Sequence, residues 1–251
     1  MSIDKLTLII GADLVIPETP VKIHQPTINE IALIGEERFF YSLNGFTINI
    51  DRIKRTIEEK TEDEEKAKVL ISNIDEYIVL LQYLQSDEGL RINFENLCNL
   101  LLINYEIQLL HGNLFMRSLD EQQFPSFQCD LNFFLKFKDT VQQIFKLNKI
   151  TEQSSLNPKG KLAEKIASKM QQTRAKIEKM NGTKEIDILS HYVSILSIGT
   201  NALNISTIKD LTIYQLYDQL ERYNLYSQYE NSLQAALAGA KVDIVDWLKK
   251  I

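Results

Sequence analysis

Apolar side chains recur at helical spacing along the C-terminal stretch Leu211–Ile251. Four of them follow at i, i+3, i+4 and i+7, the period of one buried helical face: Ile213, Leu216, Tyr217 and Leu220. Thr212 comes directly before this pattern and Gln215 follows three residues later, which is the spacing of a capping box. Gly239 is typical of a helix end, because glycine tolerates the left-handed conformation. The pattern predicts a long helix that ends near Gly239, followed by a short helix that Asp243 caps.

Aromatic side chains are concentrated in the same stretch, at Tyr214, Tyr217, Tyr223, Tyr226, Tyr229 and Trp247. One thin helix cannot bury so many rings by itself. They pack on the rest of the domain in one interpretation and form a partner surface in the other, since Tyr and Trp are enriched at interfaces. We expect Trp247 to pack on the tail helix near Tyr226 or Tyr229.

Short apolar runs and an alternating run predict two small β elements in the N-terminal half. Leu14–Ile16 and Val21–Ile23 are kept short by prolines and, with the apolar run Leu6–Ile10, indicate a hairpin or a three-stranded piece. Ile103–Leu109 alternates between apolar and polar positions and is followed by Gly112-Asn113, which predicts a second hairpin.

Helical spacing and capping residues predict several helices between and after these strands. The expected elements are a helix from the Thr27–Glu30 capping box to Asn44-Gly45, a helix over Val69–Leu84, a helix that Asn93 caps and a helix that Asp130 caps. The predicted fold class is therefore α+β and predominantly α-helical, with small β-hairpins in the N-terminal half and an all-helical C-terminal half.

A polar segment with an Asn-Pro step predicts a boundary at residues 151–160. We therefore expect an N-terminal α+β domain over residues 1–150, a linker over 151–160 and a helical C-terminal region over 161–251.

A basic amphipathic pattern over Lys159–Met180 follows that boundary. Its apolar positions repeat at three and four residues, close to a heptad seam, and seven Lys or Arg minus two Glu give it a net charge of +5 in a chain of −6. A solvated basic face is one interpretation. A docking helix for an acidic partner, or for the chain's own acidic run at residues 58–65, is another, and nucleic-acid binding is the third. The expected partner-binding residues are Lys165, Ile166, Lys169, Met170, Lys176, Tyr226, Tyr229 and Trp247.

Composition and motifs point away from several functional classes. The chain of 251 residues is 44% hydrophobic and 25% charged, ordinary for a globular protein, and its negative charge argues against charge-driven nucleic-acid binding. The sequence shows no signal peptide and no long apolar run, so we expect neither export nor a membrane span. The two cysteines are expected to stay reduced, and the three histidines show no metal-ligand spacing. We expect no enzyme activity, no cofactor and no metal.

Three segments carry a resemblance to a known group of proteins. LTIYQLYDQLERYNLYSQYENSLQAALAGAK followed by DWLKKI resembles the C-terminal end of uncharacterised proteins of tailed phages and prophages of low-GC Gram-positive bacteria. VKIHQPTINEIALIGEERFF resembles their start, and NPKGKLAEKIASKM suits the same pattern. The spacer Val242-Asp243-Ile244 is shorter than in that group. The resemblance implies a protein of the phage tail module that acts near the tape-measure protein.

The resemblance leads to a functional expectation with two alternatives. The expected function is a phage morphogenesis factor, a tail assembly chaperone that binds the tape-measure or another tail protein in the cytoplasm of the infected host and that can form homo-oligomers. The alternatives are a structural virion protein of the tail or baseplate, and a phage-encoded regulator or enzyme without a recognisable motif.

Overall fold

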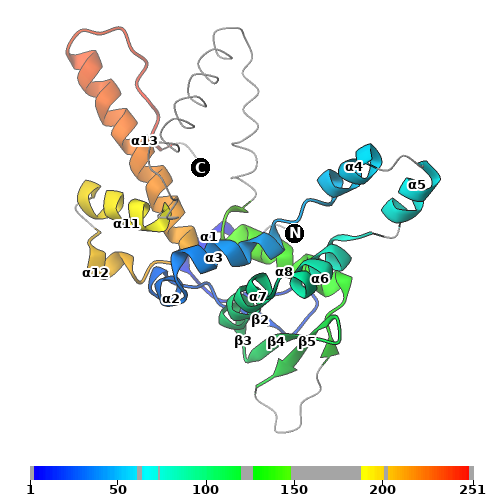
Figure 1. Cartoon of the computed structure of the whole chain (residues 1–251). Coiled ribbons are helices and arrows are strands. Elements are labelled where there is room, and N and C mark those ends of the chain that lie inside the picture. Colours follow the sequence, from blue (N-terminus) through cyan, green and yellow to red (C-terminus); the bar gives the residue numbers. More distant parts are fainter. Residues whose placement is uncertain are drawn as a thin grey trace.

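The chain is an α+β protein that is mostly helical, as the sequence predicted. The computed structural model describes residues 3–60, 64–72, 74–119, 127–147, 188–200 and 203–248. Within these ranges, the helices are joined by two small antiparallel sheets whose strand orders are β1-β2-β3 and β4-β5-β6, and β4 and β5 lie at the lower edge of the body in Figure 1. The sheets lie in the N-terminal half, and the described elements of the C-terminal part are helices.

The first sheet joins segments that lie far apart in the sequence. The hairpin of β1 (Leu14–Val15) and β2 (Lys22–Ile23) was expected, and its third strand is β3 (Leu102–Ile103). The apolar run at residues 6–10 does not supply a strand. It lies in helix α1 (Lys5–Ile10), which ends at Gly11 in the left-handed conformation (φ 71°), where glycine carries no steric penalty.

The capping box of Thr27 and Glu30 begins a helix, as predicted, but the helix is shorter than expected. α2 (Ile28–Ile34) stops at Gly35, whose φ of 94° is incompatible with a continuous helix. α3 (Glu36–Ser42) and the 3-10 turn η1 (Leu43–Phe46) then complete the segment.

Two helical hairpins follow, and they correct two expectations. The elements are α4 (Ile50–Lys60), α5 (Glu64–Ser72), α6 (Glu76–Ser86) and α7 (Glu88–Leu101). The helix expected over Val69–Leu84 is divided, because Asp75 is extended and its carboxylate accepts the Ile78 amide at the start of α6. Asp87, not Asn93, caps α7; Asn93 lies inside that helix and donates to the Gly89 carbonyl.

The second sheet contains the other predicted hairpin. β4 (Tyr105–Leu110) pairs with β5 (Asn113–Ser118), and β6 (Phe127–Gln128) adds to the outer edge of β5. His111 and Gly112 both have positive φ, 49° and 82°, as a type I′ turn requires.

The core lies where η1 packs against both α7 and α8 (Leu131–Ile144), and Asp130 caps α8 as predicted. The Phe46 ring stacks on Phe94 at 5.0 Å and meets Phe137 edge-on at 5.4 Å, and all three rings are buried.

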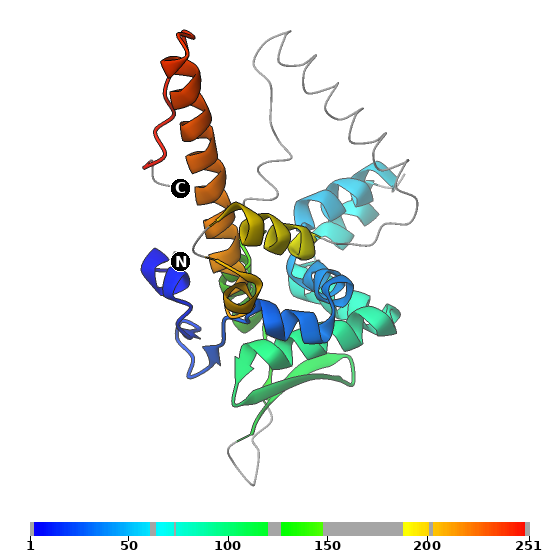
Figure 2. The same cartoon turned by 90° about the vertical axis from the view of Figure 1, so that its left-hand side faces the viewer.

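The C-terminal part consists of α11 (Ile188–Gly199), α12 (Ile205–Ile208) and the long α13 (Ile213–Leu237), which begins at the predicted Thr212–Gln215 capping box. α13 projects away from the body in both views (Figures 1 and 2). The last short helix is not formed over the described residues, since 241–246 have no regular structure. Among the described helices, none is long and apolar enough to cross a membrane.

Candidate partner-binding surface

The first turns of α13 are fixed in the body of the protein. Ile213 and Leu216 are buried, and the Tyr217 ring meets Tyr192 of α11 edge-on at 5.8 Å. Burial raises the pKa of Tyr217 above its ordinary value. Gly199, at the end of α11, lies under the ring of Tyr223, where an added Cβ would come within 2.4 Å of the ring. The base of α13 therefore packs closely on α11.

A buried charge cluster also holds this base. The Lys146 Nζ lies 3.1 Å from Glu221 Oε2, 3.9 Å from Asp218 Oδ1 and 4.6 Å above the Tyr214 ring. Lys146 and Asp218 are both buried. Because buried charges are costly unless they are paired, this cluster fixes the direction in which α13 leaves the body.

Beyond Tyr223 the helix and the residues that follow it form a projecting arm. After Gly239 (φ 89°) the chain turns back, and it runs beside α13 in Figures 1 and 2. The Val245 amide donates to the Ser232 hydroxyl at 3.1 Å, across the two parts of the arm. The expected last helix is replaced here by a return segment that bonds to α13.

Three aromatic rings join the helix to the return segment. The Trp247 ring meets Tyr226 edge-on at 5.4 Å and lies 6.4 Å from Tyr229, and the two tyrosine rings are 6.2 Å apart. The prediction that Trp247 packs near Tyr226 or Tyr229 is confirmed. Such pairs add about 0.5–1.5 kcal/mol beyond the area that they bury.

The aromatic rings leave a large part of their surface exposed, and other apolar side chains of the arm are exposed as well. Trp247 is 36% exposed and Tyr226 43%. The other exposed apolar side chains of the arm are Leu237, Val242, Ile244 and Leu248. We call this set, with Tyr226, Tyr229 and Trp247, the arm surface. Large exposed apolar surfaces often mark sites of interaction with other molecules.

The polar groups beside the arm surface favour recognition. The Tyr226 hydroxyl bonds to Glu230, which raises the pKa of this phenol. The rings thus offer apolar area together with a fixed polar edge, the combination that makes Tyr and Trp common in binding interfaces.

The structure brings together three of the eight partner-binding residues that the sequence predicted, namely Tyr226, Tyr229 and Trp247. The other five, Lys165, Ile166, Lys169, Met170 and Lys176, lie outside the described residues. The boundary at 151–160 lies outside them as well, so the domain division stays a prediction. The binding role of all eight residues also stays a prediction.

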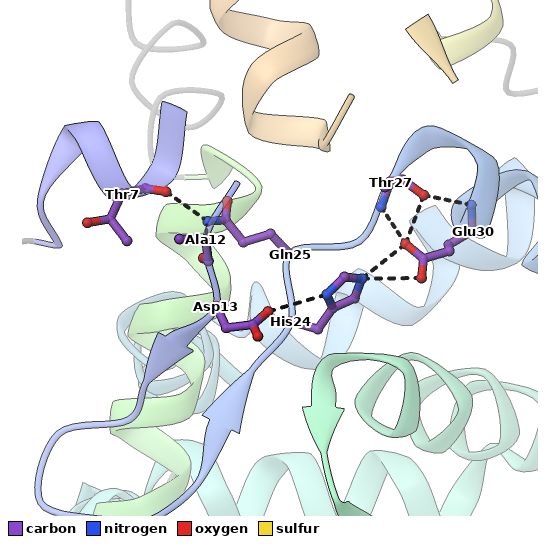
Figure 3. A network of polar contacts seen from close by, with 7 residues as sticks. All are labelled: Thr7, Ala12, Asp13, His24, Gln25, Thr27 and Glu30. Carbon is purple, nitrogen blue, oxygen red and sulfur yellow. Dashed lines mark hydrogen bonds and ion pairs between the residues drawn. The ribbon is translucent and has the colours of Figure 1, made fainter. Parts of the chain in front are cut away.

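Sequence reasoning missed a polar cluster around His24 (Figure 3). The His24 Nε2 lies 3.1 Å from Glu30 Oε2, and its Nδ1 lies 3.5 Å from Asp13 Oδ1. Glu30 also accepts the amide and the hydroxyl of Thr27, at 2.8 Å each. Burial favours protonation of Glu30, but the hydrogen bonds from Thr27 and His24 outweigh it and lower its pKa. No partner of His24 was predicted from the sequence, and its ring contacts two carboxylates.

This cluster connects the segments around β1, β2 and α2, and both ring nitrogens of His24 contact carboxylates. Beside it, the buried Gln25 amide donates to the carbonyls of Thr7 and Ala12, which ties α1 and the residue after Gly11 to the segment that follows β2 (Figure 3). Among the described residues, no group of three or more His, Cys, Asp or Glu side chains could hold a metal ion. For the contact between His24 and Glu30, the sequence gives one signal, namely that both residues lie beside a capping box. The contact between His24 and Asp13 has no local signal, because tertiary structure brings these two residues together.

The two cysteines are free and buried. Burial raises the pKa of Cys98 well above its ordinary value and that of Cys129 to about 12. Because the thiolate is the reactive form, both thiols are expected to be unreactive in the folded protein.

Comparison with known proteins gives a match over the part of the chain that contains the arm. Residues 181–251 match the family model of the YomV second domain. YomV is encoded by a Bacillus phage or prophage, and the match covers less than a third of this chain. No curated protein and no solved structure matches the chain.

Proposed function

We propose that this chain is a phage tail assembly chaperone, a binding protein without enzymatic activity that holds the tape-measure protein or another tail protein before assembly. The observation that supports the proposal is the arm surface, which a firmly anchored helix presents away from the body. The match of residues 181–251 to the YomV second domain supports the phage context.

The physical case rests on what an unassembled tail protein exposes. Long helical proteins with a heptad seam leave apolar side chains exposed until their partners arrive. A chaperone for such a helix needs apolar area of its own on a stable support. Leu248 and Leu237 of the arm surface, 70% and 79% exposed, provide that area, while the base of α13 is held by Lys146 and the ring of Tyr223.

Co-purification with a partner tests this proposal. The chain is co-expressed with a tagged tape-measure fragment from the same phage genome, and the amount recovered on the tag is measured. Leu248→Ser should lower recovery strongly, because it removes an exposed apolar contact without disturbing the core. Leu33→Ser is the matched control, since Leu33 of α2 is 82% exposed but lies outside the arm. Equal recovery of both variants and the wild-type chain would disprove the role of the arm surface.

Mass spectrometry of purified virions separates this function from a structural one. A chaperone is released on assembly and should be absent from mature particles. Stoichiometric recovery of the chain in virions would instead establish a tail or baseplate component.

A further inference from the structure

A groove runs along α8 on the side that faces the N-terminal segment. One hollow of about 730 Å³ lies between α8 and residues 3–18, and a second of about 320 Å³ lies beside it. Glu18 and Lys136 line both hollows and form an ion pair between them. We call the two hollows together the α8 groove.

The floor of the α8 groove is apolar and partly open to solvent. It includes Leu14, Val15, Pro17, Phe133 and Leu135. Val15 is 57% exposed and Leu135 42%, so both present apolar surface to the outside.

The rim of the α8 groove is acidic. Among the described residues that line it, four are carboxylates and one is a lysine, which gives a net charge of −3; the carboxylates are Asp4, Glu18, Asp130 and Asp139. The one lysine, Lys136, is already paired with Glu18. An apolar floor with an acidic rim is complementary to an apolar stripe that basic side chains border.

The dimensions fit a helix better than an added strand. The groove follows α8 from Asn132 to Thr140, nine residues and therefore about 12 Å, or roughly two helical turns. The neighbouring edge strand β1 has only two residues, and Pro17 follows shortly after it. Proline lacks the amide that pairing with an added strand needs.

We propose that the α8 groove is a docking site for an amphipathic helix of a tail protein, with Leu- or Ile-like side chains on one face and Lys or Arg beside them. The proposal rests on the proposed chaperone function and extends it, because it gives the chain a second contact with its partner. The helix places its apolar face on Val15 and Leu135, and its basic side chains lie against Asp4 and Asp139.

A model helix tests the groove without the tail protein. The probe is a labelled amphipathic peptide of Leu and Lys, roughly 14 residues long so that it exceeds the groove, and its binding to the full chain is followed by fluorescence anisotropy. Leu135→Lys should weaken binding at least tenfold. Asp139→Asn should weaken it less and reduce its dependence on salt. Leu33→Lys, at an exposed leucine of α2 outside the groove, is the control and should leave binding unchanged.

Two further measurements make the result decisive. Thermal melting must show that Leu135→Lys and Leu33→Lys fold like the wild-type chain; if Leu135→Lys does not, Val15→Lys replaces it in the same comparison. A Leu/Glu peptide of the same period should not bind. Equal binding of the Leu/Glu peptide, or unchanged binding to the folded groove variant, overturns the proposal. Loss of tape-measure recovery with Leu248→Ser but not with Leu135→Lys would disprove the groove and leave the chaperone function standing.

Discussion

Thr27 and Thr212 face each other in an antiparallel bridge, and each is the first residue of a capping box. The Ile28 amide donates to the Leu211 carbonyl, and the Asn29 amide donates to the Lys209 carbonyl. The starts of α2 and α13 are thus joined by backbone hydrogen bonds as well as capped individually. This junction ties the N-terminal part of the chain to the base of the arm.

Loss of either cap should destabilise the protein. Thr212→Ala removes the hydroxyl that accepts the Gln215 amide, and Thr27→Ala removes the one that accepts the Glu30 amide. Each should lower the free energy of unfolding by about 1 kcal/mol, measured by urea denaturation. Thr47→Ala, at an exposed threonine outside these caps, should change it by less than about 0.5 kcal/mol. Equal losses of unfolding free energy at all three sites would show that the two capping hydroxyls do not stabilise the protein more than an exposed threonine does.

Removal of the buried cation beneath α13 should have a larger effect. Lys146→Met leaves the carboxylates of Asp218 and Glu221 without the ammonium group that they now contact. Removing one partner of a buried ion pair lowers the free energy of unfolding by about 3–5 kcal/mol. Thermal and urea unfolding give this value. A loss below about 1 kcal/mol would mean that water already reaches the site.

Acid should weaken the link between Glu30 and His24. The pKa of Glu30 is lower in the folded chain than its ordinary value of 4.5, so its ionised form stabilises the fold above that pH. This contribution is lost as the pH falls through the lowered folded value. The free energy of unfolding of the wild-type chain should therefore fall more steeply below pH 4.5 than that of Glu30→Gln. Parallel curves for the two proteins would contradict this assignment.

Trp247 should report on the arm and contribute only moderately to stability. Since the ring is 36% exposed, Trp247→Ala should cost less than the 3–5 kcal/mol that is typical of a fully buried ring. The emission maximum of this single tryptophan should lie between the values for buried and water-exposed indole. An emission spectrum like that of free tryptophan would show that the contact with Tyr226 is absent in solution.

Local signals in the sequence predicted the elements that depend on neighbouring residues. The caps at Thr27, Asp130 and Thr212 and the turn at Gly112 were correct because a few adjacent residues determine them. Gly35 stopped α2 early through its backbone conformation, and the amphipathic pattern around it does not reveal that conformation.

Contacts between distant segments could not be predicted in this way. β3 pairs with β2 across most of the N-terminal half, and Asp13 reaches His24 only after α1 has packed. The contact of Trp247 with Tyr226 and Tyr229 was predictable because apolar rings so close in the sequence have few other places to pack. The groove along α8 combines residues from two unrelated segments and has no signature in the sequence.

The junction at Thr27 also sets an order of events during protein synthesis. The carbonyls of Lys209 and Leu211, which receive the amides at the start of α2, are made only after most of the chain has left the ribosome. A nascent chain that ends before Lys209 therefore exposes the start of α2 without these acceptors. Chains that terminate before Lys209 should therefore be readily degraded, whereas a chain that includes Leu211 can form the hydrogen bonds between the start of α2 and the base of the arm.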